Sequence, residues 1–262
     1  MGRIALGAHQ QVSKQARRNW QIVLSIPDVL YFDFPYEIDP KERGYVWASR
    51  RVKSRTLFNF MPDNLPVHAE FRVDTLGRPF AIDDRLQQGA DGKIIHQPLP
   101  RNYKVRGIQG QLWSETVRSE QQAQYMIFPR LLALVERAWH QPSWQVPYIY
   151  SGAKYDHTTD MFSDKKKAQR DAAWQQFNAT LSMKELVKLK RAGVFYRLLT
   201  VGAIIENMLL KVNTSLIGLP IEYKQGIGQW QPYHSPVSVK KPVQVRTRSF
   251  SGNRADRSLT LQ

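Results

Sequence analysis

A tryptophan and a glutamate lie two residues apart at the end of a short predicted strand. The run from Gly107 to Trp113 has the length and the glycine content of a strand whose backbone passes close to its neighbours, and Glu115 follows it. An indole face stacks on the C–H groups of a sugar, and a carboxylate accepts hydrogen bonds from sugar hydroxyls. The pair therefore suits a sugar site, but taken alone it is more often a tryptophan that packs in the core beside a solvated charge.

Two further aromatic residues could contribute to the same site. Tyr31 lies in the run from Leu30 to Phe34, and Trp47 ends the tetrapeptide that begins at Gly44. From the residue pattern alone, Tyr31 fits a core position with a satisfied hydroxyl group, and Trp47 fits packing as well as it fits ligand binding. Asp33 could orient a neighbouring group, but nothing in the sequence indicates that it is a catalyst.

The sequence favours no other catalytic or cofactor site. It has no cysteine, which excludes disulfides and thiolate chemistry. The six histidines show no metal-ligand spacing, and there is no phosphate-binding glycine loop and no Gly-x-Ser-x-Gly motif. We therefore expect no metal and no cofactor, and we expect the acidic pair Asp83-Asp84 to lie on a solvated surface.

The candidate residues need a parallel sheet with helices to position them. The apolar run from Trp20 to Ser25 is typical of a buried parallel strand, and a helix over about 10–19 would supply a βαβ connection. A helix is predicted over 119–139, divided or kinked at Pro129. Its apolar stripe, at three- and four-residue spacing, consists of Ile127, Phe128, Leu131, Leu132, Val135 and Trp139. Residues 40–106 predict a long irregular connection over the mouth of the fold.

The second part of the chain predicts helices followed by a small sheet. A helix is expected over 165–178, and Ser182-Met-Lys-Glu185 has the form of a capping box that opens another helix, which ends at Gly193. The short β runs that follow are 196–199, 220–223, 230–233, 243–249 and 258–261. Their turn signals and spacing favour an antiparallel sandwich.

A change of composition between about Pro142 and Asp164 predicts a domain boundary. We interpret residues 1–150 as one domain, residues 151–192 as a helical linker region, and residues 193–262 as a β domain.

The chain is strongly basic, with a net charge of +16 and a pI near 10.1. Such a charge raises nucleic acid or anionic membrane as partners. The charge is spread out, however: residues 1–152 hold 20 basic and 14 acidic residues, and residues 153–262 hold 18 and 8. We therefore expect no nucleic-acid partner, and no segment has the roughly 18 to 20 apolar residues of a membrane span.

Three segments resemble one known enzyme family. They are Gly107 to Trp139, Ser25 to Glu37 and Asn178 to Arg257, and the resemblance that they carry extends over nearly the whole chain. They resemble the bacterial β-N-acetylhexosaminidases of the chitobiase type, glycoside hydrolase family 20. The resemblance implies an α/β fold, a partial TIM barrel built from the last strands and helices of a (β/α)8 barrel, followed by a small all-β immunoglobulin-like sandwich.

The resemblance also implies a ligand and roles for four residues. The ligand would be an oligosaccharide that contains N-acetylglucosamine, hydrolysed at its terminal sugar. Trp113 would wall the pocket around this sugar, and Glu115 would bind its outer hydroxyls. Tyr31 would hydrogen-bond the acetamido oxygen, and Trp47 would stack on the next sugar.

The resemblance assigns the catalytic acid for this hydrolysis to an adjacent Asp-Glu pair, and this sequence does not contain such a pair. No Asp-Glu dipeptide occurs in the 262 residues. We therefore expect the chain to begin inside the barrel and to be inactive alone, with residues 1–150 poorly folded and residues 180–262 folding independently. Two other interpretations stay open: one half of a split enzyme that binds the missing N-terminal half, or a noncatalytic sugar-binding or interaction protein. The localisation is left undetermined.

Overall fold

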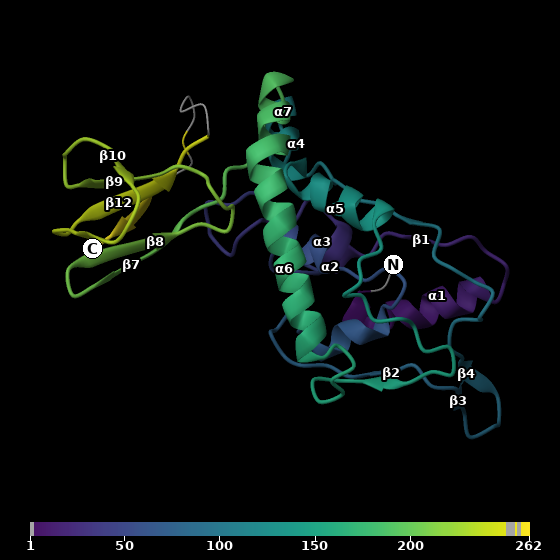
Figure 1. Cartoon of the computed structure of the whole chain (residues 1–262). Helices are drawn as coiled ribbons and strands as arrows, with labels where there is room; N and C mark the ends of the chain where they lie inside the picture. The colour runs from purple at the N-terminus through teal and green to yellow at the C-terminus, as the bar shows by residue number, and fades with distance from the viewer. Residues whose placement is uncertain (1–2, 250–254, 256–257) are drawn as a thin grey trace. The chain divides into compact units, whose positions relative to one another are not determined.

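The computed structural model describes residues 3–249, 255 and 258–262. The chain forms two compact units, Met1–Trp174 and Gln175–Gln262 (Figure 1). In the described part of the chain, none of the helices combines the length and the apolarity that a bilayer crossing needs.

A short parallel ladder lies at the centre of the first unit. Strand β1 (Val23–Leu24) pairs in parallel with β5 (Gly107–Ile108), and the ladder resumes at an isolated bridge between Tyr31 and Gln111. The predicted strands are thus present, but much shorter than expected. No third strand joins this ladder among the described residues, and Val23, expected to be buried, is 53% exposed.

Three short helices precede or interrupt this ladder. They are the 3-10 helix η1 (Ile4–Leu6), α1 (Ala8–Ala16) and α2 (Pro27–Leu30). Pro27 is the first residue of α2, where its missing N–H leaves no bond unmade. Helix α2 ends at Leu30, and the next residue, Tyr31, has an extended backbone, so the chain re-enters the ladder there.

The long predicted helix is divided in two, as its proline indicated. Helix α4 (Glu120–Ile127) is capped by the Ser119 hydroxyl, and α5 (Arg130–Trp139) begins after a cis bond between Phe128 and Pro129.

The predicted apolar stripe was wrong for α5. The buried face consists of Arg130, Ala133, Leu134 and Arg137, whereas Val135 and Trp139 are 43% and 87% exposed. Both stripes satisfy helical spacing. The arginines occupy the buried one because aromatic rings and backbone carbonyls surround their guanidinium groups.

The segment predicted as an irregular connection supplies much of the core of this unit. It contains α3 (Ser54–Phe58), the 3-10 helix η2 (Pro66–Glu70) and the strands β2 (Ile82–Asp83), β3 (Gln87–Gln88) and β4 (Ile94–His96). Strand β2 pairs with β6 (Lys154–Tyr155), and β3 pairs with β4, both antiparallel. Phe58 of α3 packs against Trp144 and Trp174, with ring centroids 5.9 and 5.2 Å away.

One continuous helical rod follows (Figure 1). It consists of α6 (Asp164–Thr180), a π-helical stretch η3 (Leu181–Glu185) and α7 (Leu186–Arg191). The predicted capping box was wrong, because Ser182 lies inside the rod rather than at a helix start. Its hydroxyl donates to the carbonyl of Ile217 at 2.6 Å, which ties the rod to the chain that follows β8.

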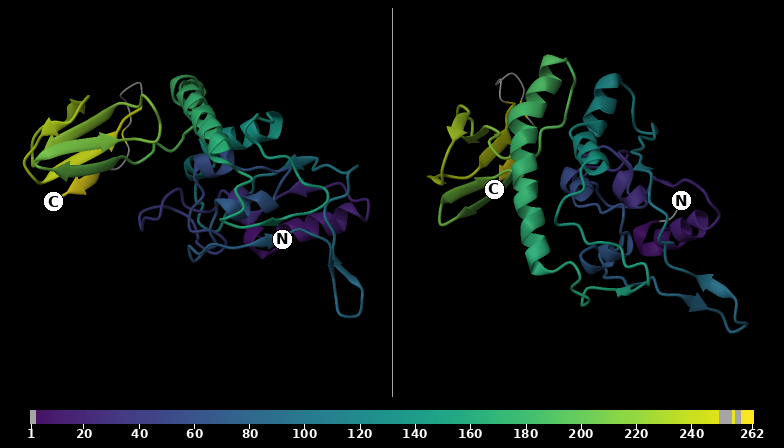
Figure 2. Two further views of the ribbon diagram at one scale, coloured as in Figure 1. Left: turned by 60° about the horizontal axis from the view of Figure 1, so that its bottom comes forward. Right: turned by 45° about the vertical axis from the view of Figure 1, so that its right-hand side comes forward.

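Two antiparallel sheets form the rest of the second unit (Figure 2). One has the order β10-β9-β12-β13: Gln231–Tyr233, Ile221–Gln225, Val243–Thr247 and Leu259–Leu261. The other has the order β11-β8-β7: Val237–Ser238, Leu209–Asn213 and Gly202–Glu206. Side chains from both sheets share one apolar core, which includes Leu210, Tyr223 and Val245.

The sequence misplaced the first strands of this unit. Residues 196–199 do not pair as a strand in the described structure; instead the Thr247 hydroxyl donates to the Leu199 carbonyl at 2.9 Å. The unpredicted hairpin of β7 and β8 turns at Asn207 and Met208, which both have positive φ. That is the conformation of a two-residue hairpin turn, but methionine replaces the glycine that normally signals it.

Candidate functional site

Tyr31 and Trp113 meet where the parallel ladder ends. Tyr31 pairs with Gln111 in the bridge, and Trp113 lies two residues further along. Their ring centroids are 6.0 Å apart at an angle of 60°. Tyr31 is 2% exposed and Trp113 is 44% exposed, so a buried hydroxyl-bearing ring adjoins an open indole.

Trp47 reaches the same place from a different segment. Its ring centroid lies 5.9 Å from that of Tyr31, and the indole is 55% exposed. The approach depends on Gly44, which has a φ of 126° and lies against the backbone from Asp33 to Pro35. The amide of Tyr45 donates to the Asp33 carbonyl at 3.2 Å, which fixes the loop beside the ladder.

Two side-chain contacts join this loop to the segment after Trp113. Arg43 donates to the carbonyl of Thr116 at 2.6 Å, and the Tyr125 hydroxyl donates to Glu42 at 3.1 Å. The loop that carries Trp47 and the turn that carries Trp113 are thereby held together, so the three aromatic rings form one cluster.

Two carboxylates accompany the rings. Glu115 is exposed, and Asp33 is 3% exposed, with an Oδ1 atom that has no hydrogen-bond partner among the described residues. Burial raises the pKa of Asp33 and the negative charge of Glu115 adds to the rise, while a hydrogen bond from the Trp47 side chain opposes it. Glu115 is therefore within electrostatic reach of Asp33, beside the aromatic cluster.

Arg130, which the sequence did not reveal, positions the backbone beneath the cluster. Its fully buried guanidinium donates to the carbonyls of Phe32 at 2.5 Å, Phe34 at 2.7 Å and Val52 at 3.2 Å. The guanidinium carbon also lies 3.9 Å from the centroid of the Tyr36 ring. These bonds hold the peptide on both sides of Asp33.

The structure therefore brings together the aromatic residues that the sequence singled out, Tyr31, Trp47 and Trp113, with Glu115 beside them. The aromatic rings can stack on the apolar faces of a ring-shaped ligand, while a carboxylate accepts hydrogen bonds from the hydroxyl groups of that ligand. The individual roles of these residues stay predictions.

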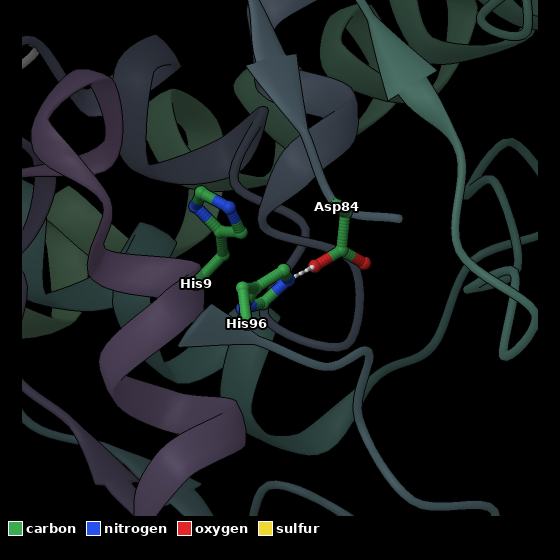
Figure 3. A group of neighbouring side chains, drawn as sticks. All are labelled: His9, Asp84 and His96. Atoms are coloured by element: carbon green, nitrogen blue, oxygen red, sulfur yellow. Dashed lines mark hydrogen bonds and ion pairs between the residues drawn. The ribbon is translucent and has the colours of Figure 1, made fainter. Parts of the chain in front are cut away.

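A second cluster contradicts one expectation from the sequence. His9, Asp84 and His96 lie together, 7%, 1% and 3% exposed (Figure 3). Asp84 was expected on a solvated surface, but the alternation of β2 turns it inward after the buried Ile82. The histidines showed no ligand spacing because 87 positions separate His9 from His96.

Comparisons with known proteins agree with the resemblance. Residues 5–142, more than half of the chain, match the glycosyl hydrolase family 20 catalytic domain, and residues 185–258 match the chitobiase/beta-hexosaminidase C-terminal domain. A beta-hexosaminidase of Vibrio vulnificus is 35% identical over 96% of this chain and 29% of its own length. Beta-hexosaminidase B of Pseudoalteromonas piscicida is 47% identical over 63% of this chain and 20% of its own length.

A crystal structure of a family 20 exo-β-N-acetylglucosaminidase from Vibrio harveyi superposes with a TM-score of 0.40 and 19% identity, over 73% of this chain and 21% of that one. The chain thus spans less than a third of the length of these relatives. The extent of the catalytic-domain match nevertheless establishes the family: this protein belongs to glycosyl hydrolase family 20.

Proposed function

We propose that this chain forms part of the sugar pocket of a β-N-acetylhexosaminidase of the chitobiase type. The observation that carries the proposal is the aromatic cluster, in which Tyr31 lies 5.9 Å from Trp47 and 6.0 Å from Trp113 by ring centroids. Trp113 stacks on the terminal N-acetylglucosamine, and Glu115 accepts hydrogen bonds from the outer hydroxyl groups of this sugar. Tyr31 donates to the acetamido oxygen, and Trp47 stacks on the next sugar.

The proposed architecture follows the same resemblance. Residues 1–150 are the C-terminal part of a (β/α)8 barrel and include about its last two βα units; residues 151–192 are a helical linker region. Residues 193–262 are a β-sandwich domain of the immunoglobulin-like kind. The parallel ladder of β1 and β5 and the two antiparallel sheets support this division.

The proposed reaction of the whole enzyme removes terminal N-acetylglucosamine from chitooligosaccharides with retention of configuration. The acetamido carbonyl oxygen of the substrate attacks the anomeric carbon, and the bond to the leaving oxygen breaks as a carboxylic acid protonates that oxygen. A second carboxylate steadies the positive charge on the acetamide, and Tyr31 holds its oxygen in line. Water then opens the oxazolinium intermediate.

The 262 residues contain no Asp-Glu dipeptide to provide these two carboxylates. We assign them to a segment outside the part of the family that this chain matches, which is 29% of the length of the Vibrio vulnificus relative. The chain alone binds sugar but does not hydrolyse it, and the partner it needs is the N-terminal half of such an enzyme. Binding by the chain alone requires residues 1–150 to fold, against the expectation from the sequence, and the compact first unit supports this.

Sugar binding is tested by calorimetric titration of the chain with chitobiose. Trp113→Ala should weaken binding by roughly tenfold, because an aromatic contact contributes about 0.5 to 1.5 kcal/mol beyond the area it buries. Trp139→Ala is the matched control, since Trp139 is 87% exposed at the end of α5. Equal affinities of the two variants would refute the assignment of Trp113.

Hydrolysis is tested with p-nitrophenyl N-acetylglucosaminide. The chain is assayed alone and mixed with the N-terminal part of the Vibrio harveyi N,N'-diacetylchitobiase, a relative 35% identical over 98% of this chain. Activity only in the mixture supports a pocket completed by a second segment. Binding without activity in either case favours a noncatalytic sugar-binding protein, and activity of the chain alone would show that the acid has been misassigned.

A further inference from the structure

The cluster of His9, Asp84 and His96 has the composition of a metal site. Each of these residues offers one ligand atom, and the three atoms all lie within 4.8 Å of one another (Figure 3). The residues come from α1, from the residue after β2, and from the end of β4. Two imidazoles and one carboxylate are a donor set suited to zinc and similar divalent transition ions.

The environment of His9 is a second reason to expect a ligand at this cluster. It is 7% exposed, and neither ring nitrogen has a hydrogen-bond partner among the described residues. A buried polar ring without a partner is unfavourable, so its retention needs a reason. A neutral imidazole nitrogen carries a lone pair that can bind a metal ion.

The carboxylate is already oriented by its neighbours. His96 Nε2 lies 2.8 Å from Asp84 Oδ1, and the Tyr148 hydroxyl donates to Asp84 Oδ2. That hydroxyl in turn accepts the Leu99 amide at 2.8 Å. In known metal sites, groups that hydrogen-bond to the ligands in this way typically fix the orientation of those ligands.

From this arrangement we propose that His9, Asp84 and His96 bind one zinc-like divalent cation, with water as the fourth ligand. Ligand atoms about 2.0 to 2.2 Å from a tetrahedral ion lie roughly 3.4 Å apart. The cation would therefore insert between His96 and Asp84, and the most distant ligand atom would move inward by a little over an ångström. The cation joins α1 to the β2–β4 segment, so its effect is structural and is separate from the sugar site.

The test uses the whole chain, freed of metal with a chelator and then titrated with Zn²⁺ and Co²⁺. The expected result is one ion per chain, a raised midpoint of thermal unfolding with Zn²⁺, and strong visible absorption by four-coordinate Co²⁺. His9→Phe keeps an aromatic ring at this position and should weaken Zn²⁺ binding by more than about 100-fold, since even the loss of a group that only hydrogen-bonds to a ligand changes metal affinity 10- to 100-fold.

The control is His140→Ala. His140 is exposed, and its Nδ1 atom lies 2.7 Å from Glu136 Oε1. The substitution therefore removes a different His–carboxylate pair and should leave Zn²⁺ affinity unchanged. If His9→Phe does not fold, Asp84→Asn, which keeps the size of the side chain, must show the same loss. No Zn²⁺-dependent shift in the unmodified chain, or equal Zn²⁺ affinity in the cluster variants, would overturn the proposal.

Discussion

The substitution Gly44→Ala tests whether close backbone contact positions Trp47. At φ 126° an alanine Cβ would collide with the Asp33 carbonyl oxygen, and it would lie only 2.8 Å from Pro35 N and 2.9 Å from Phe34 C. All three atoms belong to the backbone, so no side-chain rotation can relieve the collision. The loop must instead move away from Asp33, and the bond from the Tyr45 amide to the Asp33 carbonyl is lost.

The expected loss of stability has two parts. A non-glycine residue in such a conformation costs about 1 to 3 kcal/mol, and overpacking adds about 1 to 3 kcal/mol. Gly77→Ala is the control for a positive φ without a collision, because Gly77 has a φ of 81° and nothing within 4 Å of its would-be Cβ. We therefore expect Gly44→Ala to lower the free energy of unfolding by about 1 to 3 kcal/mol more than Gly77→Ala does.

Urea unfolding of both variants measures this difference. Displacement of the loop should also weaken chitobiose binding in Gly44→Ala and leave it unchanged in Gly77→Ala. If the two variants lose equal stability and bind chitobiose alike, the loop does not need the close approach and the reasoning fails.

Three further substitutions test buried positions of the first unit. Burial lowers the pKa of His68 to about 3. As the pH falls below the ordinary value of 6.5, only the unfolded chain protonates this histidine, so the folded state loses stability. The unmodified chain should lose about 2 kcal/mol more than His68→Gln between pH 7 and pH 5 in urea unfolding, and equal losses would contradict a neutral buried His68. Arg130→Met removes the donor from the carbonyls of Phe32, Phe34 and Val52. It should lower the free energy of unfolding by at least about 3 kcal/mol in urea unfolding, and a loss below about 1 kcal/mol would contradict the role of Arg130. Gly110→Ala, whose Cβ would lie 2.8 Å from the Phe32 ring, should lower the thermal midpoint, whereas the unobstructed Gly107→Ala should lower it less.

The residues that carry local signals were predictable from the sequence. Trp113 follows an apolar run with glycines, and Pro129 cannot continue a helix, so the end of the ladder and the break between α4 and α5 could both be foreseen. The meeting of Tyr31 with Trp113 also follows from two parallel strands ending at one edge. Tyr31 and Trp113 lie 82 positions apart, but each of the two strands could be recognised from its own residues.

The parts that were missed depend on contacts between distant segments. Asp84 is an ordinary acidic loop residue until β2 pairs with β6, about 70 positions later, and turns it toward His96. Arg130 looks like a solvent-facing helical charge until the carbonyls of Phe32 and Phe34 surround it. A charged side chain is buried only when other segments satisfy it, and the sequence does not state which segments those are.

Binding and hydrolysis must be separable in this protein if the proposed function holds. The groups proposed to contact the sugar are fixed by contacts inside the first unit: Arg130 holds the peptide around Asp33, and Gly44 brings Trp47 to Tyr31. The ladder beside them has two strands among the described residues, so its outer edges can accept further strands. A barrel closes only when those edges are paired, and the Asp-Glu carboxylates would arrive with the strands that pair them. Sugar affinity should therefore survive in the isolated chain, while turnover should depend on the concentration of the complementary segment.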